Sequence, residues 1–145
     1  MSHPACVLDA SVAVSWCLKD ENDRYAIGVL EQLHDHAVTA PAIWPLEVGN
    51  SLLVAERRAR MTSEDLAQAL GFLLRLPVEC EHQDPGHCFS VVLPIAHEHG
   101  LSAYDASYLE LAMREGLPLA TMDTHLAHAA RKCGVARYQP GGSRQ

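Results

Sequence analysis

The chain has 145 residues, 48% of them hydrophobic, which is enough for one domain with its own core. Eleven Lys and Arg residues against eighteen Asp and Glu residues give a net charge of −7. This balance disfavours a protein that binds nucleic acid through a broadly basic surface. No apolar run approaches the roughly 20 residues that cross a bilayer, so we expect no membrane span.

The chain alternates short apolar runs with longer segments of helical periodicity. In chain order, we expect a strand at 5–8, helices at 11–18 and 23–36, a strand at 38–40, helices at 45–61 and 62–76, and a strand at 78–81. A helix at 86–99, kinked by Pro94, precedes a helix at 102–115, a strand at 119–122, a helix at 124–133 and a strand at 135–138. Thr62 begins a capping-type Thr-x-x-Asp pattern.

This alternation predicts an α/β fold, a three-layer sandwich with a short, mostly parallel central sheet flanked by helices. One domain spans 1–138, and 139–145 is expected to be a flexible C-terminal tail. The five cysteines are scattered without a Cys-x-x-Cys motif, and Met1 to Ala5 lacks the basic segment of a secretory leader. We therefore expect a reduced, cytoplasmic protein.

Four acidic residues are predicted to meet at one edge of this sheet. Asp9 and Asp123 directly follow apolar strand segments, whereas Glu47 and Asp105 fall in the first turns of helices. Strands that run into helices all end at the same edge of a parallel sheet, and ligands bind there. We therefore expect the four carboxylates to lie close together although they are far apart in the chain.

Each acid also has a simpler explanation. Asp9 and Asp123 could cap the helices that follow them, Asp105 could form a capping box with Ser102, and Glu47 could favour a helix dipole. Capping does not require four acids to converge, however. Carboxylates that crowd together repel one another unless a cation lies between them, and hard oxygen ligands favour Mg²⁺ or Mn²⁺.

Four motifs around these acids resemble the PIN-domain nucleases, and more narrowly the VapC toxins of bacterial toxin–antitoxin pairs. They are residues 7–11 (VLDAS), 47–50 (EVGN), 104–112 (YDASYLELA) and 119–123 (LATMD). The resemblance extends from about residue 7 to residue 135. It implies that the four acids bind the metal, with Asp9 and Asp105 on the primary ion. It also implies that Ser11, Asn50 and Thr121 support them.

The resemblance implies a metal-dependent endoribonuclease that hydrolyses RNA with metal-activated water. It further implies an RNA substrate such as tRNA, homodimerisation, and a cognate antitoxin that inserts a basic side chain near the acids. The few basic residues depart from what RNA binding requires. Arg57 and Arg58, which lie in a cluster with Arg60, are the candidate RNA contacts, although such a cluster is also typical of a solvated helix face.

Other residues could form rival sites. Cys80, His82, His87 and Cys88 could be zinc ligands, although their spacing departs from the usual Cys-x₂₋₄-Cys pattern. The histidines of the segment 97–99 (HEH) are too close in sequence for the His-Glu-x-x-His metalloprotease motif. His125 and His128 could face the acids or simply lie on the surface.

Three other classes of function stay open at this point. A metal-free ribonuclease could use paired histidines and the RNA 2′-hydroxyl, and excess EDTA would distinguish it. A receiver-like phosphoacceptor would need adjacent acids and a lysine after the last strand, whereas the only lysines are Lys19 and Lys132. A protein-interaction domain could offer an apolar groove for a partner helix, built from Val12, Trp16 and Leu18 with Leu66, Leu70 and Leu73.

Overall fold

The structure is a computed structural model that describes residues 3–141 of the chain. Its strands are β1 (Val7–Leu8), β2 (Val38–Ala40), β3 (Val78–Cys80) and β4 (Leu119–Ala120). Its helices are α1 (Ala10–Cys17), α2 (Arg24–Gln32), α3 (Trp44–Arg57), α4 (Ser63–Leu74), α5 (Pro85–His87), α6 (Leu93–His99), α7 (Ala103–Glu115) and α8 (Thr124–Lys132). A π-helical turn, η1 (Cys88–Val92), joins α5 to α6.

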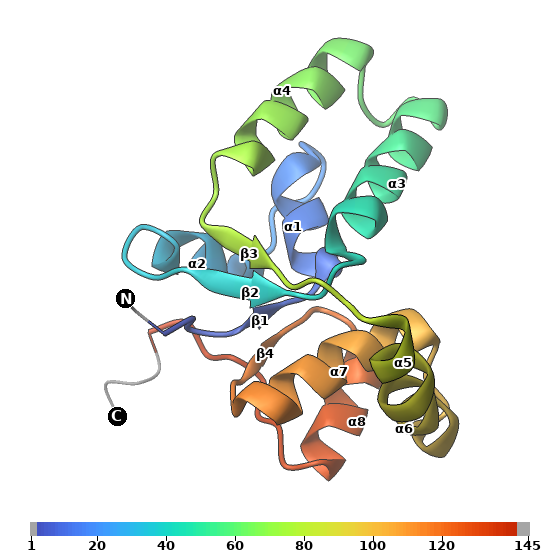
Figure 1. The fold of residues 1–145 in the computed structure, drawn as a ribbon. Helices are drawn as coiled ribbons and strands as arrows, with labels where there is room; N and C mark the ends of the chain where they lie inside the picture. Colours follow the sequence, from blue (N-terminus) through green and yellow to red (C-terminus); the bar gives the residue numbers. More distant parts are fainter. Residues whose placement is uncertain (1–2, 142–145) are drawn as a thin grey trace.

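The four strands form one parallel sheet in the order β3-β2-β1-β4. Figure 1 shows the sheet between two helical layers, with α1, α3 and α4 on one side and α5 to α8 on the other. The three-layer α/β prediction is therefore confirmed. No helix within residues 3–141 combines the length and apolar character that a membrane span requires.

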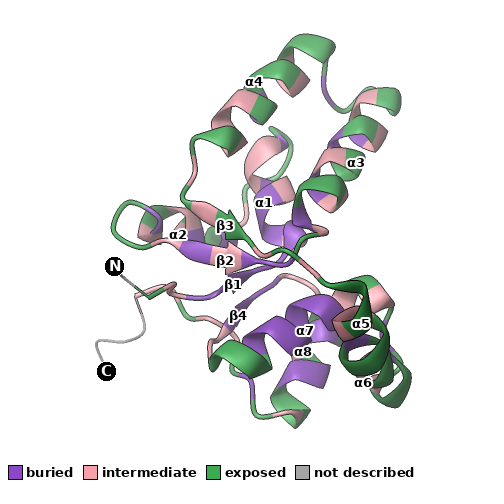
Figure 2. Ribbon diagram, viewed as in Figure 1, coloured by how far each residue is buried: buried purple, intermediate pink, exposed green. Residues whose placement is uncertain are grey.

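The core lies where the sheet meets α1 and α7. Both residues of β1, Val7 and Leu8, are inaccessible to solvent, as are Leu119 and Ala120 of β4. Helix α7 is buried over seven consecutive residues, from 106 to 112, so it is surrounded by protein on most of its circumference (Figure 2). In contrast, α4 has only one buried residue. The carboxyl ends of β1 and β4 are thus rigidly placed by dense packing.

Short polar residues cap α7 and α8, two of the helices that position the acids. Ser102 accepts a hydrogen bond from the backbone N–H of Asp105 at 3.0 Å, and Asp123 accepts two from the first turn of α8. At α4, Thr62 and Asp65 form the reciprocal capping box that the sequence predicts. These bonds satisfy backbone N–H groups that have no partner within the helix, which fixes where each helix begins.

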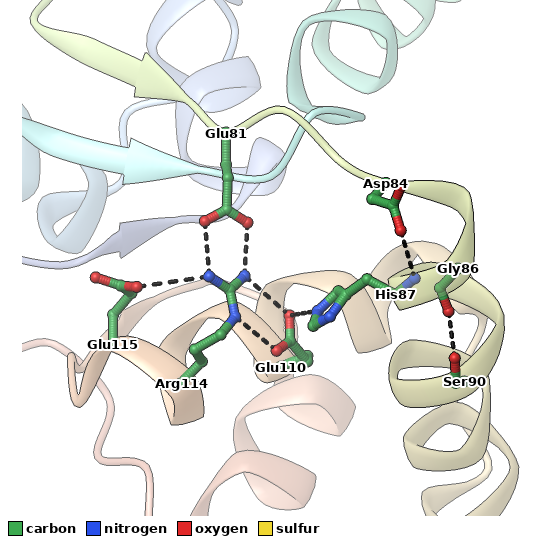
Figure 3. Close-up of polar contacts among 8 residues, drawn as sticks. All are labelled: Glu81, Asp84, Gly86, His87, Ser90, Glu110, Arg114 and Glu115. Carbon is green, nitrogen blue, oxygen red and sulfur yellow. Dashed lines mark hydrogen bonds and ion pairs between the residues drawn. The ribbon is translucent and has the colours of Figure 1, made fainter.

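An ion-pair network connects α7 to the loop that follows β3 (Figure 3). Arg114 donates two hydrogen bonds to Glu81, at 2.6 and 2.8 Å, and two to Glu110, at 2.8 and 3.1 Å. His87 Nε2 lies 3.1 Å from Glu110 Oε1, but is not aligned for a hydrogen bond. Burial alone would raise the pKa of Glu110, yet the contacts with Arg114 and His87 lower it overall.

Several predicted elements are shorter in the structure, such as the helix predicted at 45–61, which ends at Arg57, and three of them show the difference most clearly. The helix predicted at 86–99 is interrupted by η1 just before Pro94, because the missing proline N–H favours a local change of helical hydrogen bonding. The strand predicted at 135–138 is only a single parallel bridge, between Leu119 and Arg137. The helix predicted at 23–36 ends at Gln32, and turns follow it.

The predicted tail at 139–145 falls only partly within the structure. The ring of Pro140 lies against α2, where a Cβ on Gly28 would come within 3.3 Å of it. Tyr25 of the same helix donates a hydrogen bond to the carbonyl of Tyr138 at 2.8 Å. Residues 142–145 lie outside the described part of the chain, so the flexibility of the tail stays a prediction.

Candidate active site

All four predicted acids line one cleft of about 500 Å³ at the carboxyl edge of the sheet. Asp9 follows β1, Asp123 precedes α8, and Glu47 and Asp105 lie in the first turns of α3 and α7. Four separate elements therefore bring these side chains to one place. Ser11 and Asn50, two of the three predicted supporting residues, also line the cleft, whereas Thr121 is buried and reaches the cleft through its bond to Asp9.

Asp9 is the most enclosed of the four, with 5% of its surface exposed. Its Oδ2 accepts hydrogen bonds from the Ser11 and Thr121 hydroxyls, both at 2.7 Å. These hydroxyls also accept bonds from the backbone N–H groups of Met122 and Asp123, at 3.1 and 3.0 Å. The pair thus ties the end of β1 to the segment after β4 and fixes the position of the Asp9 carboxylate.

Burial raises the pKa of the Asp9 carboxyl, and the nearby charge of Asp123 raises it further. The hydrogen bonds from Ser11 and Thr121 act in the opposite direction, because they stabilise the charged form. The net effect is a raised pKa. Asp9 makes no side-chain capping bond to α1, so capping does not explain its presence.

Glu47 depends on a tyrosine that sequence reasoning missed. The hydroxyl of Tyr108 donates a hydrogen bond to Glu47 Oε1 at 2.6 Å, and Tyr108 is fully buried. Burial raises the pKa of Glu47, the bond from Tyr108 lowers it, and the charges of Asp9 and Asp105 raise it. A signal was present in the sequence, because Tyr108 follows Asp105 by three residues and therefore shares its face of α7.

Asp105 and Asp123 complete the acidic cleft. Burial raises the pKa of Asp105, and the charges of Asp123 and Asp9 add to this effect. His125 and Ser102 lower the pKa of Asp105. The ring of His125 contacts the carbonyl of Gly100 at 3.4 Å and does not line the acidic cleft. Asp123 Oδ1 accepts bonds from the backbone N–H groups of His125 and Leu126 at 2.9 and 3.1 Å, so Asp123 does cap α8.

The acids are not neutralised by the protein itself. Between residues 3 and 141, none of the four forms an ion pair with Lys, Arg or His. Glu21, a further acid lining the cleft, is paired with Arg60 at 3.2 Å. Burial, together with the charges of neighbouring acids, raises the pKa values of Asp9, Glu47 and Asp105, and a divalent cation would relieve the cost of their ionisation.

The donor set fits a hard divalent cation, although the side chains are not gathered around one point. Over the described residues, no three His, Cys, Asp or Glu side chains are positioned to hold an ion together as they stand. Each of Asp9, Glu47 and Asp123 is instead held by its own hydroxyl or backbone donors. Small side-chain rotations within the open cleft would therefore accompany binding of an ion.

The possible zinc ligands Cys80, His82, His87 and Cys88 do not form a metal-binding cluster within residues 3–141. His87 points to Glu110 instead (Figure 3). Lys19 is paired with Asp65 on α4 at 2.9 Å, rather than placed among the acids as a receiver domain would need. Arg57 and Arg58 are exposed at the end of α3 and do not line the acidic cleft.

The fold and the cleft define a parallel α/β protein whose functional edge is a cluster of carboxylates from four elements. The PIN domain family model matches residues 6–132, and the chain belongs to this family. PIN domains are typically metal-dependent nucleases, which is in keeping with the chemistry of the cleft.

Solved structures share this fold. PAE2754 from Pyrobaculum aerophilum aligns with a TM-score of 0.62 at 24% identity, over 87% of this chain and 86% of the other. FitAcB from Neisseria gonorrhoeae aligns with a TM-score of 0.62 at 20% identity, over 94% of this chain and 98% of the other. FitAB bound to an IR36 DNA fragment aligns with a TM-score of 0.54 at 19% identity, over 93% of this chain and 94% of the other. No curated protein matches the sequence.

Proposed function

We propose that this PIN-domain protein is a Mg²⁺- or Mn²⁺-dependent endoribonuclease that acts as the toxin of a toxin–antitoxin pair. The observation that carries the proposal is the cleft itself, in which Asp9, Glu47, Asp105 and Asp123 meet without a protein cation. Structural side chains of this kind are usually paired, so four unpaired acids in one cleft are best explained by a bound divalent ion.

The chemistry divides among residues of the cleft. We propose that Asp9 and Asp105 would hold the ion, and that Glu47 and Asp123 would contact it directly or through water. Bound Mg²⁺ or Mn²⁺ would lower the pKa of a coordinated water and offset the charge of the leaving oxygen. Glu47 is the candidate acceptor of the proton from the attacking water, whose oxygen bonds to phosphorus as the P–O bond to the leaving nucleotide breaks.

The supporting residues act through the acids. Ser11 and Thr121 hold the Asp9 carboxylate in place with two short hydrogen bonds, which limits its rotation. Tyr108 performs the same role for Glu47 and keeps its charged form accessible. Asn50 lines the cleft, where its amide could contact the substrate or a coordinated water.

The biological role rests on the VapC resemblance of the sequence. We propose that the substrate is a structured RNA such as tRNA, that the chain forms a homodimer, and that a cognate antitoxin blocks the cleft with a basic side chain. Uncompensated carboxylates would attract such a side chain. Arg57 and Arg58 stay candidate RNA contacts at a distance from the acids.

RNA cleavage with matched variants tests the proposal. Wild-type protein should cleave an RNA mixture in Mg²⁺ and lose this activity in EDTA, whereas Asp9→Asn and Asp105→Asn should be inactive with unchanged circular dichroism. Asp35→Asn is the matched control, because Asp35 is exposed and lies outside the cleft. Equal cleavage by all variants would refute the site. Cleavage that persists in EDTA and leaves cyclic phosphate ends would indicate histidine chemistry.

A further inference from the structure

A second cleft adjoins the acidic one and has the opposite charge. Its volume is about 340 Å³, and it shares Met122 and Asp123 with the acidic cleft. Arg131, Arg137 and His128 contribute to its lining. In a chain with a net charge of −7, two arginines beside the carboxylates form a local exception to the overall charge.

Arg137 is held in place through only part of its side chain. Its Nε donates a hydrogen bond to the carbonyl of Thr121 at 2.9 Å, and its guanidinium carbon lies 3.6 Å from the centre of the Tyr25 ring. Within residues 3–141, the two terminal nitrogens of Arg137 have no hydrogen-bond or ion-pair partner. The guanidinium is therefore oriented in advance, and its terminal donors are available to a ligand.

A purely structural role explains the contacts of Arg137, but not its unpaired terminal nitrogens. The bond to Thr121 and the stacking on Tyr25 fasten the segment after α8 to the sheet. They do not explain the unpaired terminal nitrogens, nor why Arg131 lines the same cleft from the last turn of α8. Among the cations of residues 3–141, Lys19, Arg60 and Arg114 are paired with acids, whereas Arg131 and Arg137 share the unpaired state with several surface cations and differ from them in lying beside the acidic cleft.

We infer that Arg131 and Arg137 bind a backbone phosphate of an RNA strand, next to the phosphate that is cleaved. This inference rests on the proposed function and deepens it. The two clefts adjoin at Met122 and Asp123, so a single strand bound in the acidic cleft would need to pass only these residues to reach the basic one. Planar guanidinium groups pair with phosphate through two parallel hydrogen bonds, which suits a fixed arginine.

The inference explains how an acidic protein can hold a polyanion. A bound divalent ion would reverse the local charge at the carboxylates, and the two arginines would extend this positive region along the strand. Such phosphate contacts carry no sequence information. They fix the register of the strand, and the sequence preference of the enzyme then depends on other residues.

Binding measured separately from cleavage tests the inference. A fluorescent 12-nucleotide single-stranded RNA with a non-hydrolysable backbone is titrated in Mg²⁺ with the full-length wild-type protein as the parent, with and without Arg131→Gln. The matched control is Arg75→Gln, because Arg75 is an exposed arginine at the end of α4, on the other side of the sheet (Figure 1). Arg131 carries the test because changing Arg137 would also remove its contacts with Thr121 and Tyr25.

Arg131→Gln should weaken RNA binding about tenfold, as expected for a lost charged hydrogen bond. The slope of log affinity against log salt should fall by about 0.7, the value for one phosphate on a single strand. Arg75→Gln should change neither quantity. Equal binding by the two variants, or no RNA binding by the parent, would overturn the inference. If Arg131→Gln weakens binding but the wild type cleaves no RNA, the phosphate site stands and the proposed hydrolysis fails.

Discussion

Removing the Arg114 guanidinium should destabilise the fold far more than removing an ordinary surface cation. Arg114 makes four hydrogen bonds to Glu81 and Glu110, and only 5% of the Glu110 side chain is exposed. Arg114→Met would keep most of the packing of the aliphatic part and leave a buried carboxylate without its counterion. Arg60→Met is the matched control, since Arg60 also binds acids, Asp20 and Glu21, but at an exposed site.

The expected magnitude follows from the difference in burial. Breaking a fully buried ion pair costs about 3–5 kcal/mol, whereas exposed pairs contribute about 0.2–1 kcal/mol. Arg114 is 35% exposed, so solvent screens part of the loss and about 2 kcal/mol is expected for Arg114→Met. This corresponds to a decrease in melting temperature of roughly 4–8 °C for a chain of this size. Arg60→Met should cost much less, because solvent screens its ion pairs.

Urea unfolding at several pH values measures both the size and the origin of the effect. The pKa of Glu110 is lowered in the folded protein, so its stabilising contribution is present above the pKa of the unfolded chain. That contribution disappears as pH falls through the folded-state pKa. The difference in free energy of unfolding between the wild type and Arg114→Met should therefore be large at pH 7 and become smaller in acid. A loss of unfolding free energy as small as that of Arg60→Met, or one that does not change with pH, would refute this reasoning.

Three further predictions concern other parts of the molecule. Thr62→Ala should lower the free energy of unfolding by about 1 kcal/mol in urea titrations, because it removes one side of the capping box with Asp65, and Thr62→Ser should restore most of it. Leu126→Ala should cost about 2–5 kcal/mol, because Leu126 is fully buried; a loss below 1 kcal/mol would contradict its place in the core. Tyr108→Phe removes the bond that lowers the pKa of Glu47, so the acid limb of the cleavage pH profile should move to higher pH, and an unmoved limb would exclude Glu47 as the proton acceptor.

Local sequence patterns were sufficient to predict much of this fold. The strand at 38–40 has the predicted bounds, and the Thr62 cap is present, because both depend on residues adjacent in the chain. The convergence of the four acids on one cleft was also predictable. It required only that each acid follow a strand or begin a helix in a parallel α/β fold.

Features that depend on tertiary packing were not predictable in the same way. The single bridge at Arg137 reflects how that segment meets the edge of the sheet. The burial of α7 on nearly all sides includes Glu110, whose charge is tolerated only because Arg114 reaches it. Likewise, Tyr108 is a partner of Glu47 from an element 61 residues away.

The charged groups of the site were likewise predictable only in part from the sequence. Residue types indicated a metal site, but not which donors hold each acid in place, because hydroxyls such as that of Thr121 come from a neighbouring strand segment. The sequence pattern indicated Arg57 and Arg58 as RNA contacts because they are clustered in the chain. Arg131 and Arg137 are six residues apart and line one cleft because the chain turns after α8.

Melting temperature as a function of Mn²⁺ or Mg²⁺ concentration tests most directly whether mutual repulsion at the cleft is relieved by a divalent ion. Without metal, Asp105→Asn should melt at a higher temperature than the wild type, because it removes one of the repelling charges. Added metal should stabilise the wild type by about 2.7 kcal/mol at a hundred times the dissociation constant, and the variant much less. A wild type insensitive to both ions, together with a variant that melts lower without metal, would contradict the account.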